Sequence, residues 1–197
     1  MSLLDSLRKI EKQVKNCNLC PLSKSRTNAV PGEGPNNAKV MIIGEAPGYN
    51  EDIQGRPFVG SAGQLLSELL ESIGMKREEV FITNIVKCRP PKNRPPRVEE
   101  KKACMPYLIR QIKIIGPRII CPLGNSALNA LVGRMSIGEA HGKTIEKEGI
   151  LYLPLYHPAA ALYDISLRSV LFSDFKKLKS ILNNLSDLIS DAAKFSY

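Results

Sequence analysis

Four of the five cysteines stand where their thiols could meet. Cys17 and Cys20 form a CxxC pair near the start of the chain, and Cys88 and Cys104 follow. Four thiolates suit a tetrahedral zinc ion or an iron–sulfur cluster, and a CxxC alone also suits a redox pair. A zinc ribbon usually has two CxxC knuckles and this chain has one, which favours a cluster over zinc. Four unbound, buried cysteines are the remaining alternative, and Cys121, inside an apolar run, is expected to be a small buried residue.

Three polar residues follow or end apolar runs. Glu45 follows KVMIIG, Asn84 lies in VFITNIV, and His157 is near the end of ILYLPLYHP. These runs and RIICPLG are typical of buried strands, and the segments between them are long enough for helices. Alternating strands and helices predict a parallel sheet covered on both faces, with ligands bound beyond the carboxyl ends of the strands. We therefore expect the three side chains to share one site.

Amphipathic helices should pack on this sheet. Leu4, Leu7, Ile10 and Val14 recur at helical spacing before the CxxC, and SAGQLLSELLESIG predicts a second helix that ends near Gly74. A last helix is expected to dock on the core, with a partner-binding stripe as the alternative. Its apolar positions are Leu171, Phe175, Leu178, Leu182, Leu185 and Ile189.

Length and composition limit the class of protein. A chain of 197 residues that is 43% hydrophobic fits one domain, residues 1–197. The 28 basic residues exceed the 19 acidic ones by nine, which favours a polyanionic partner. No apolar run reaches the roughly 18 residues of a membrane span, and the N-terminus does not resemble a signal peptide. We expect a cytoplasmic protein, where an odd number of cysteines argues against a disulfide framework.

Residues 87–102 concentrate positive charge. They carry seven basic residues, two acidic residues and two Pro-Pro pairs. Because proline disrupts helices and strands, we expect a stiff, exposed loop, pinned at Cys88 if that cysteine binds a metal. Such a loop could lie along phosphates, although a solvated connection would look the same. The candidate contacts are Lys87, Arg89, Lys92 and Arg94.

Four motifs together carry a specific resemblance. GEAPGYNED (44–52), GRPFVGSAGQLL (55–66), TNIVKCRPP (83–91) and YHPAA (156–160), with the four cysteines, resemble the iron–sulfur family 4 uracil-DNA glycosylases of bacteria and archaea. The resemblance implies a three-layer α/β/α fold with a central four-stranded parallel sheet. It also implies a structural [4Fe–4S] cluster held by Cys17, Cys20, Cys88 and Cys104. The implied activity is monofunctional: uracil is removed from DNA, leaving an abasic site for base-excision repair.

The resemblance also implies roles around a flipped base. Uracil stacked in a duplex must rotate into a pocket before its glycosidic bond can be reached. Phe58 would stack on the base, and Asn84 would pair with O4 and N3–H, a pattern that cytosine reverses. His157 would stabilise the charge that develops on O2. Gly44 and Ala46 are expected to line the same pocket.

The reaction also needs a carboxylate to stabilise the sugar cation and to orient water. Glu45 is our first choice, with Glu51 and Asp52 as rivals. Related glycosylases often carry Asp or Asn where this chain has Ala46, so their water-activating residue does not transfer. Leu162 is a candidate wedge for the gap left by the flipped base, or else the start of a buried helix.

Two other functions fit the residues without the resemblance. One is a nucleic-acid-binding module braced by a metal, and the other is an α/β hydrolase of free uridine nucleotides. We favour the glycosylase, acting as a monomer on single- or double-stranded DNA that contains uracil. Free uracil would be its product, and a sliding clamp is a candidate partner.

Overall fold

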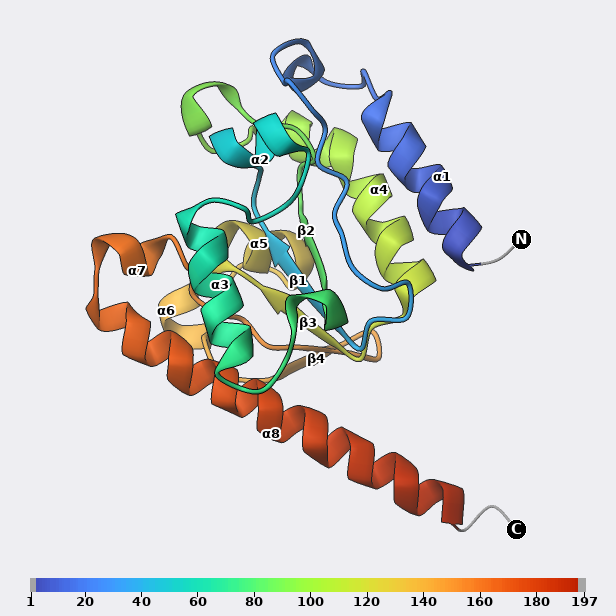
Figure 1. Ribbon diagram of the computed structural model, residues 1–197, viewed down its shortest axis with the longest axis vertical. Helices are drawn as coiled ribbons and strands as arrows, with labels where there is room; N and C mark the ends of the chain where they lie inside the picture. The colour runs from blue at the N-terminus through green and yellow to red at the C-terminus, as the bar shows by residue number, and fades with distance from the viewer. Residues whose placement is uncertain (1–2, 195–197) are drawn as a thin grey trace.

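The computed structural model describes residues 3–194, with side chains from residue 6 to residue 185. One sheet has the strand order β2-β1-β3-β5-β4 (Figure 1). The strands are β1 (Val40–Gly44), β2 (Phe81–Asn84), β3 (Ile119–Pro122), β4 (Ile145–Lys147) and β5 (Ile150–Tyr152). All neighbours pair in parallel except β4, which runs antiparallel to β5. The predicted count of four strands was one short, because the three residues of β4, IEK, contain no apolar run.

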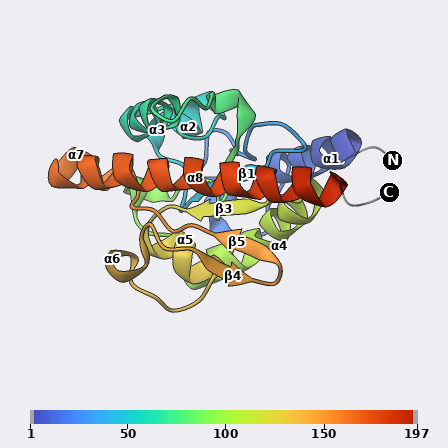
Figure 2. The ribbon, with the colours of Figure 1, turned by 90° about the horizontal axis from the view of Figure 1, so that it is seen from below.

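Helices flank the sheet on both sides. Figure 2, seen from below, places α3 on one side of the sheet and α4 and α5 on the other. The helices are α1 (Leu3–Lys15), α2 (Tyr49–Gln54), α3 (Ser61–Glu71), α4 (Val98–Ile115), α5 (Gly124–Leu131), α6 (Ile137–Ala140), α7 (Ala160–Tyr163) and α8 (Ser166–Lys194). Three short 3₁₀ turns are η1 (Pro21–Lys24), η2 (Arg77–Glu79) and η3 (Pro91–Asn93).

Strand β1 shows why both faces of the sheet need a helical layer. Every residue of β1 is buried. Val40 and Ile42 belong to the apolar cluster that contains the buried residues of α3 and α8, whereas Met41 and Ile43 belong to the cluster of α1 and α4. Successive strand side chains point to opposite faces, so an entirely apolar strand must be covered twice. The predicted three-layer α/β/α arrangement is confirmed.

Helix α8 docks on the core as predicted. Leu171, Phe175 and Leu178 are fully buried, and Leu182 and Leu185 pack against the same cluster. The side chain of Ile189 lies outside the described residues, as does that of Leu4 in α1. Figure 1 shows the second half of α8 extending beyond the sheet. Within the described part of the chain, no helix combines the length and apolarity needed to cross a bilayer.

The first turn of α3 supports the loop that carries Phe58. A Cβ placed on Gly63 would lie 1.8 Å from the carbonyl oxygen of Phe58. Phe58 itself has a φ of +50°, a left-handed conformation that is uncommon for a bulky residue. A glycine at position 63 therefore leaves the space in which this strained loop can sit.

The substitution Gly63→Ala tests that packing. We expect the free energy of unfolding to fall by about 1–3 kcal/mol, because the added methyl group must displace the backbone of Phe58. Gly138→Ala is the matched control, since its Cβ would meet its nearest neighbours at an ordinary 3.6 Å. Denaturant unfolding measures both variants. Equal stability of the two variants would show that the Phe58 loop does not depend on Gly63.

Candidate active site

A cavity of about 360 Å³ opens at the carboxyl ends of β1 and β2. Its lining includes six of the residues predicted for the site: Glu45, Ala46, Glu51, Phe58, Asn84 and His157. A larger groove of about 970 Å³ lies beside α1, but it contains none of these six side chains. We therefore place the candidate site in the smaller cavity, where the polar groups converge.

Gly44, predicted to line the pocket, is not among the residues that line this cavity but lies directly against two of them, Asn84 and Phe58. A Cβ at this position would lie 2.4 Å from Asn84 Oδ1 and 2.7 Å from Cζ of Phe58. The amide of Asn84 and the ring of Phe58 therefore pack directly over the end of β1. Gly44 and Asn84 are paired in the parallel register of β1 and β2, which brings the two strand ends level.

Asn84 offers an unused hydrogen-bond acceptor. The residue is 2% exposed, and Oδ1 is a buried atom without a partner in the described structure. Leaving a buried acceptor unpaired costs free energy, so such an atom usually has a functional explanation. A ring N–H of a ligand in the cavity would satisfy it.

Lys87 hydrogen-bonds the backbone of Asn84 inside the protein. The prediction that Lys87 contacts DNA is therefore wrong. Its side chain is 1% exposed. The ammonium group donates to Thr83 Oγ1, the carbonyl oxygen of Asn84 and Gln111 Oε1 at 2.6, 2.8 and 2.8 Å. Burial lowers the pKa of Lys87 to about 7. The side chain points into the protein because these three acceptors satisfy it there, so it does not reach a phosphate on the surface.

Phe58 and His157 form an aromatic wall. Their ring centroids are 5.5 Å apart and the planes differ by 29°. Burial lowers the pKa of His157 to about 4, although the nearby charge of Glu51 acts in the opposite direction. The backbone N–H of Ala159 donates to Nδ1 of His157 at 3.1 Å. A neutral His157 therefore carries its proton on Nε2, which makes that nitrogen a donor.

Two of the three candidate carboxylates are occupied by backbone groups. Glu51 Oε1 accepts from the N–H groups of Val59 and Gly60 at 2.8 and 2.9 Å, and Oε2 accepts from Gly48 at 3.1 Å. Glu51 thus braces the loop next to Phe58. A carboxylate with both oxygens engaged in this way is poorly suited to holding a water molecule.

Asp52 lies away from the cavity. It is 3% exposed and accepts from the backbone N–H of Thr27 at 2.9 Å and of Asn28 at 3.3 Å. Asp52 therefore ties α2 to the segment before β1. Glu45 is different, because it lines the cavity and its one ionic partner among the described residues is Lys101, at 3.9 Å.

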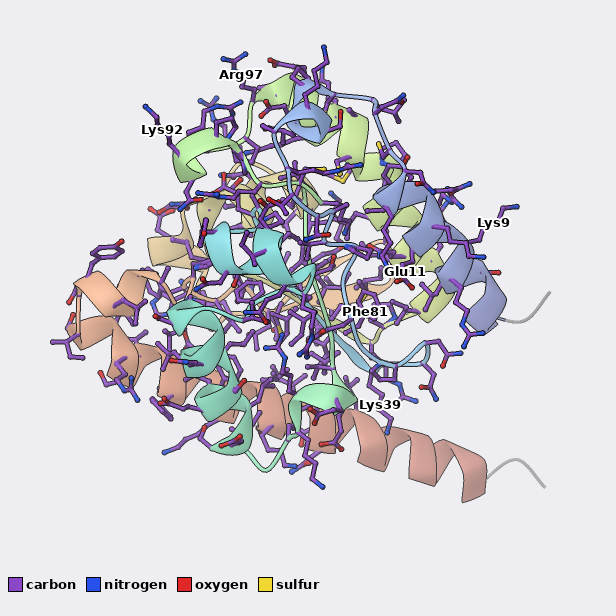
Figure 3. The ribbon with its side chains drawn as sticks, turned by 45° about the horizontal axis from the view of Figure 1, so that its top comes forward. Lys9, Glu11, Lys39, Phe81, Lys92 and Arg97 are labelled. Carbon is purple, nitrogen blue, oxygen red and sulfur yellow. The ribbon has the colours of Figure 1, made fainter. Side chains whose placement is uncertain are left out.

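The predicted basic loop is partly helical and partly neutralised. It contains η3, and α4 begins at Val98, because no proline follows the second Pro-Pro pair until Pro106, well inside the helix. Both terminal nitrogens of Arg94 donate to buried Glu100, at 2.9 and 2.6 Å. Arg89 donates to Asn93 and lies 5.0 Å above the ring of Tyr49. Lys92 is exposed, and Figure 3 shows it extending outward at the same end of the molecule as Arg97.

An exposed apolar tip follows the histidine motif. Leu162 is 50% exposed in the short helix α7, and its neighbours Tyr163 and Ile165 are 93% and 76% exposed. Asp164 accepts from the backbone N–H and the hydroxyl group of Ser166, which fixes the chain where α8 begins. Leu162 is therefore not the start of a buried helix.

The four predicted ligand cysteines line one cavity between α1, η1 and α4. Cys88 and Cys104 are buried and Cys17 and Cys20 are half-buried, whereas Cys121 is buried in β3 as expected. Burial raises the pKa of Cys104 to about 11, so its free thiol stays protonated at neutral pH. Among side chains 6–185, no group of His, Cys, Asp and Glu forms a recognisable site for a single metal ion.

Hydrogen-bond donors surround this cysteine cavity. The guanidinium group of Arg26 donates to Cys88 Sγ at 3.0 Å, and the backbone N–H of Lys87 donates to Cys104 Sγ at 3.2 Å. Donors of this kind stabilise thiolates. The donor set therefore fits a thiolate-bound metal group.

Sequence reasoning did not single out Arg26 or Lys101. Arg26 and Lys101 gain their partners only through contacts between segments distant in the chain.

Comparisons with known proteins identify the family of this chain. A family model described as the uracil DNA glycosylase superfamily matches residues 31–185. A type-4 uracil-DNA glycosylase of Sulfurisphaera tokodaii is 51% identical over 189 residues, which cover 90% of this chain and 86% of that protein. Proteins of the same name from Archaeoglobus fulgidus and Thermotoga maritima are 42% and 44% identical. They cover 95% and 88% of this chain, and 99% and 93% of their own lengths. The chain therefore belongs to the uracil DNA glycosylase superfamily and, within it, to the type-4 uracil-DNA glycosylases.

Proposed function

We propose that this protein removes uracil from DNA by hydrolysing the N-glycosidic bond, and that it leaves an abasic site. The observation that carries the proposal is the unpartnered Oδ1 of Asn84, buried in a cavity beside the stacked rings of Phe58 and His157. Family membership supports the same activity, since the relatives are named uracil-DNA glycosylases.

Recognition requires that the nucleotide leaves the base stack. Flipping brings the planar base against Phe58, which provides a stacking face. Asn84 Oδ1 accepts from uracil N3–H while its amide nitrogen donates to O4. Cytosine has an acceptor at N3 and a donor at C4, so the fixed amide of Asn84 opposes it.

His157 and Glu45 have different roles in the hydrolysis: His157 stabilises the leaving base, and Glu45 acts on the sugar and the water. The bond between C1′ and N1 breaks, and its electron pair goes to uracil. The Nε2–H of neutral His157 donates to O2 as negative charge develops there. Glu45 faces the sugar cation and orients the water whose oxygen bonds to C1′. The proton lost by that water balances the uracil anion, and free uracil leaves.

The DNA would approach the rim that carries Lys92 and Arg89. Exposed Lys92 would contact a phosphate, while Arg94 is held by Glu100 and lines the cavity. Leu162 lies beyond His157 and is exposed, so it can enter the space that a flipped base leaves. Binding to single or double strands, a monomeric state, a sliding clamp as partner and a cytoplasmic location stay predictions.

The four cysteines would hold a [4Fe–4S] cluster with a structural role. When bound, the cluster would link α1, the segment after β2, and α4 through four thiolates. This arrangement would anchor the residues that lead from Asn84 to Lys92. Arg26 and the N–H of Lys87 would stabilise the negative charge on the thiolates.

The activity is tested with an oligonucleotide that holds one uracil, beside the matched thymine strand. We expect alkali-sensitive cleavage at uracil alone, and about 100-fold lower kcat/KM for Asn84→Ala because both edge hydrogen bonds are lost. Asn37→Ala, at an exposed position, is the control. No cleavage by metal-loaded protein would leave a DNA-binding module, and turnover of free uridine nucleotides would point to a nucleotide hydrolase.

The pKa of His157 predicts the pH dependence. Since burial lowers this pKa from 6.5 to about 4, the neutral donor persists as pH falls through 6.5 and is lost only near pH 4. We expect the single-turnover rate to show no titration near pH 6.5. Rates between pH 5 and 8 provide the measurement. A rate that falls as the pH rises through 6.5 would mean that His157 acts as a cation, and a rate that falls as the pH drops through 6.5 would mean that its pKa is not lowered.

The cysteine assignment predicts which substitutions remove the visible absorption of the protein. Each of Cys17→Ala, Cys20→Ala, Cys88→Ala and Cys104→Ala should lose the broad visible absorption of an iron–sulfur cluster. Cys121→Ala should keep it, because Cys121 lies in β3 away from the cysteine cavity. Iron, sulfide and zinc analysis completes the test. A colourless wild-type protein that contains zinc would exclude the cluster.

A further inference from the structure

Among the residues whose side chains are described, Lys101 is the one cation paired with Glu45, the carboxylate that the proposed mechanism uses. Its Nζ lies 3.9 Å from Glu45 Oε1 and donates to Ser126 Oγ at 2.7 Å. Lys101 is in the first turn of α4, and Ser126 is in the first turn of α5. Three elements that follow three different strands thus meet beside the cavity.

The neighbouring charges leave Lys101 available to Glu45. Glu100, the residue before it, is 1% exposed and takes both terminal nitrogens of Arg94. Glu99 lies 4.0 Å from Arg97. The acidic groups next to Lys101 in sequence therefore have their own arginine partners, and Ser126 holds the ammonium group of Lys101 beside Glu45.

The length of the contact matters for the chemistry. At 3.9 Å the ammonium group attracts the carboxylate without a direct hydrogen bond, so both oxygens of Glu45 stay free to accept from water or to face the sugar. Glu51, by contrast, spends both oxygens on backbone N–H groups. The side chains of Lys101 and Glu45 are 28% and 33% exposed. Without the attraction between them, the Glu45 side chain would be free to turn toward solvent.

We propose that Lys101, held by Ser126, is a positioning residue that keeps the Glu45 carboxylate directed into the cavity during glycosidic bond hydrolysis. This inference rests on the function proposed above. Lys101 acts through Glu45 and touches neither the base nor the sugar. The alternative role for a lysine at this position is a phosphate contact, which would affect DNA binding instead of the chemical step.

A double-mutant cycle separates these roles. The variants are Lys101→Met, Glu45→Gln and the pair, assayed for kcat and KM on the single-uracil oligonucleotide. We expect Lys101→Met to lower kcat about tenfold or more with KM changed less than about twofold, because a misplaced catalytic group slows only the chemical step. In the Glu45→Gln background the same change should have no further effect. Lys101→Arg should restore most of the rate.

Lys102→Met is the matched control, since it removes one positive charge from the exposed neighbouring position. Ser126→Ala should show a smaller loss of kcat in the same direction as Lys101→Met. Circular dichroism and visible absorption verify that each variant keeps its fold and metal group. Additive losses in the cycle, or a rise in KM with kcat unchanged, would overturn the proposal. Inactive wild-type and Lys102→Met proteins would instead refute the proposed function, so the two failures are distinguishable.

Discussion

The absence of a side chain at Gly44 is the constraint on which the site depends. A Cβ there would collide with Asn84 Oδ1 and with the ring of Phe58, so glycine allows the amide and the aromatic ring to meet over the end of β1. The parallel register of β1 and β2 then holds this meeting point level with the strand ends. His157, beyond β5, adds the second ring and a hydrogen-bond donor.

The acidic residues in and around the site differ in the groups that they bind. Glu51 and Asp52 accept backbone hydrogen bonds and so hold the Phe58 loop and the segment before β1. Glu100 fixes Arg94 and accepts from the N–H of Arg97 at the start of α4. Moving any of these carboxylates would leave buried N–H groups or a guanidinium group unpaired. The carboxylate of Glu45 makes no such hydrogen bond among the described residues, so it is available to interact with a substrate.

The cysteine cavity and the candidate active-site cavity share one short segment. Asn84 contributes its side chain to the pocket and its carbonyl oxygen to the ammonium group of Lys87. Lys87 also donates its backbone N–H to Cys104, and Cys88 follows directly. A metal group bound at these cysteines would therefore restrain the backbone that orients Asn84, a structural contribution that needs no redox chemistry.

The sequence by itself determined the layers of the fold and the neighbourhood of the site. Buried parallel strands have a local signature of continuous apolar residues, and the carboxyl ends of such strands lie at one edge, so the convergence of Glu45, Asn84 and His157 was predictable. The family resemblance, carried by motifs in a fixed order, also needed no coordinates. Strand β4 escaped prediction because it is short and mixed in polarity.

Only the tertiary structure decided which charged groups are free. Lys87 and Arg94 look alike in a basic segment, yet one is buried against three acceptors and the other is paired with Glu100. Glu45, Glu51 and Asp52 lie within eight residues of one another and differ only in what approaches them. These differences arise from the partners that the fold brings to each group, some near in sequence, such as Glu100 for Arg94, and some distant, such as Thr27 for Asp52. The type of a polar residue does not by itself reveal which partner it will meet.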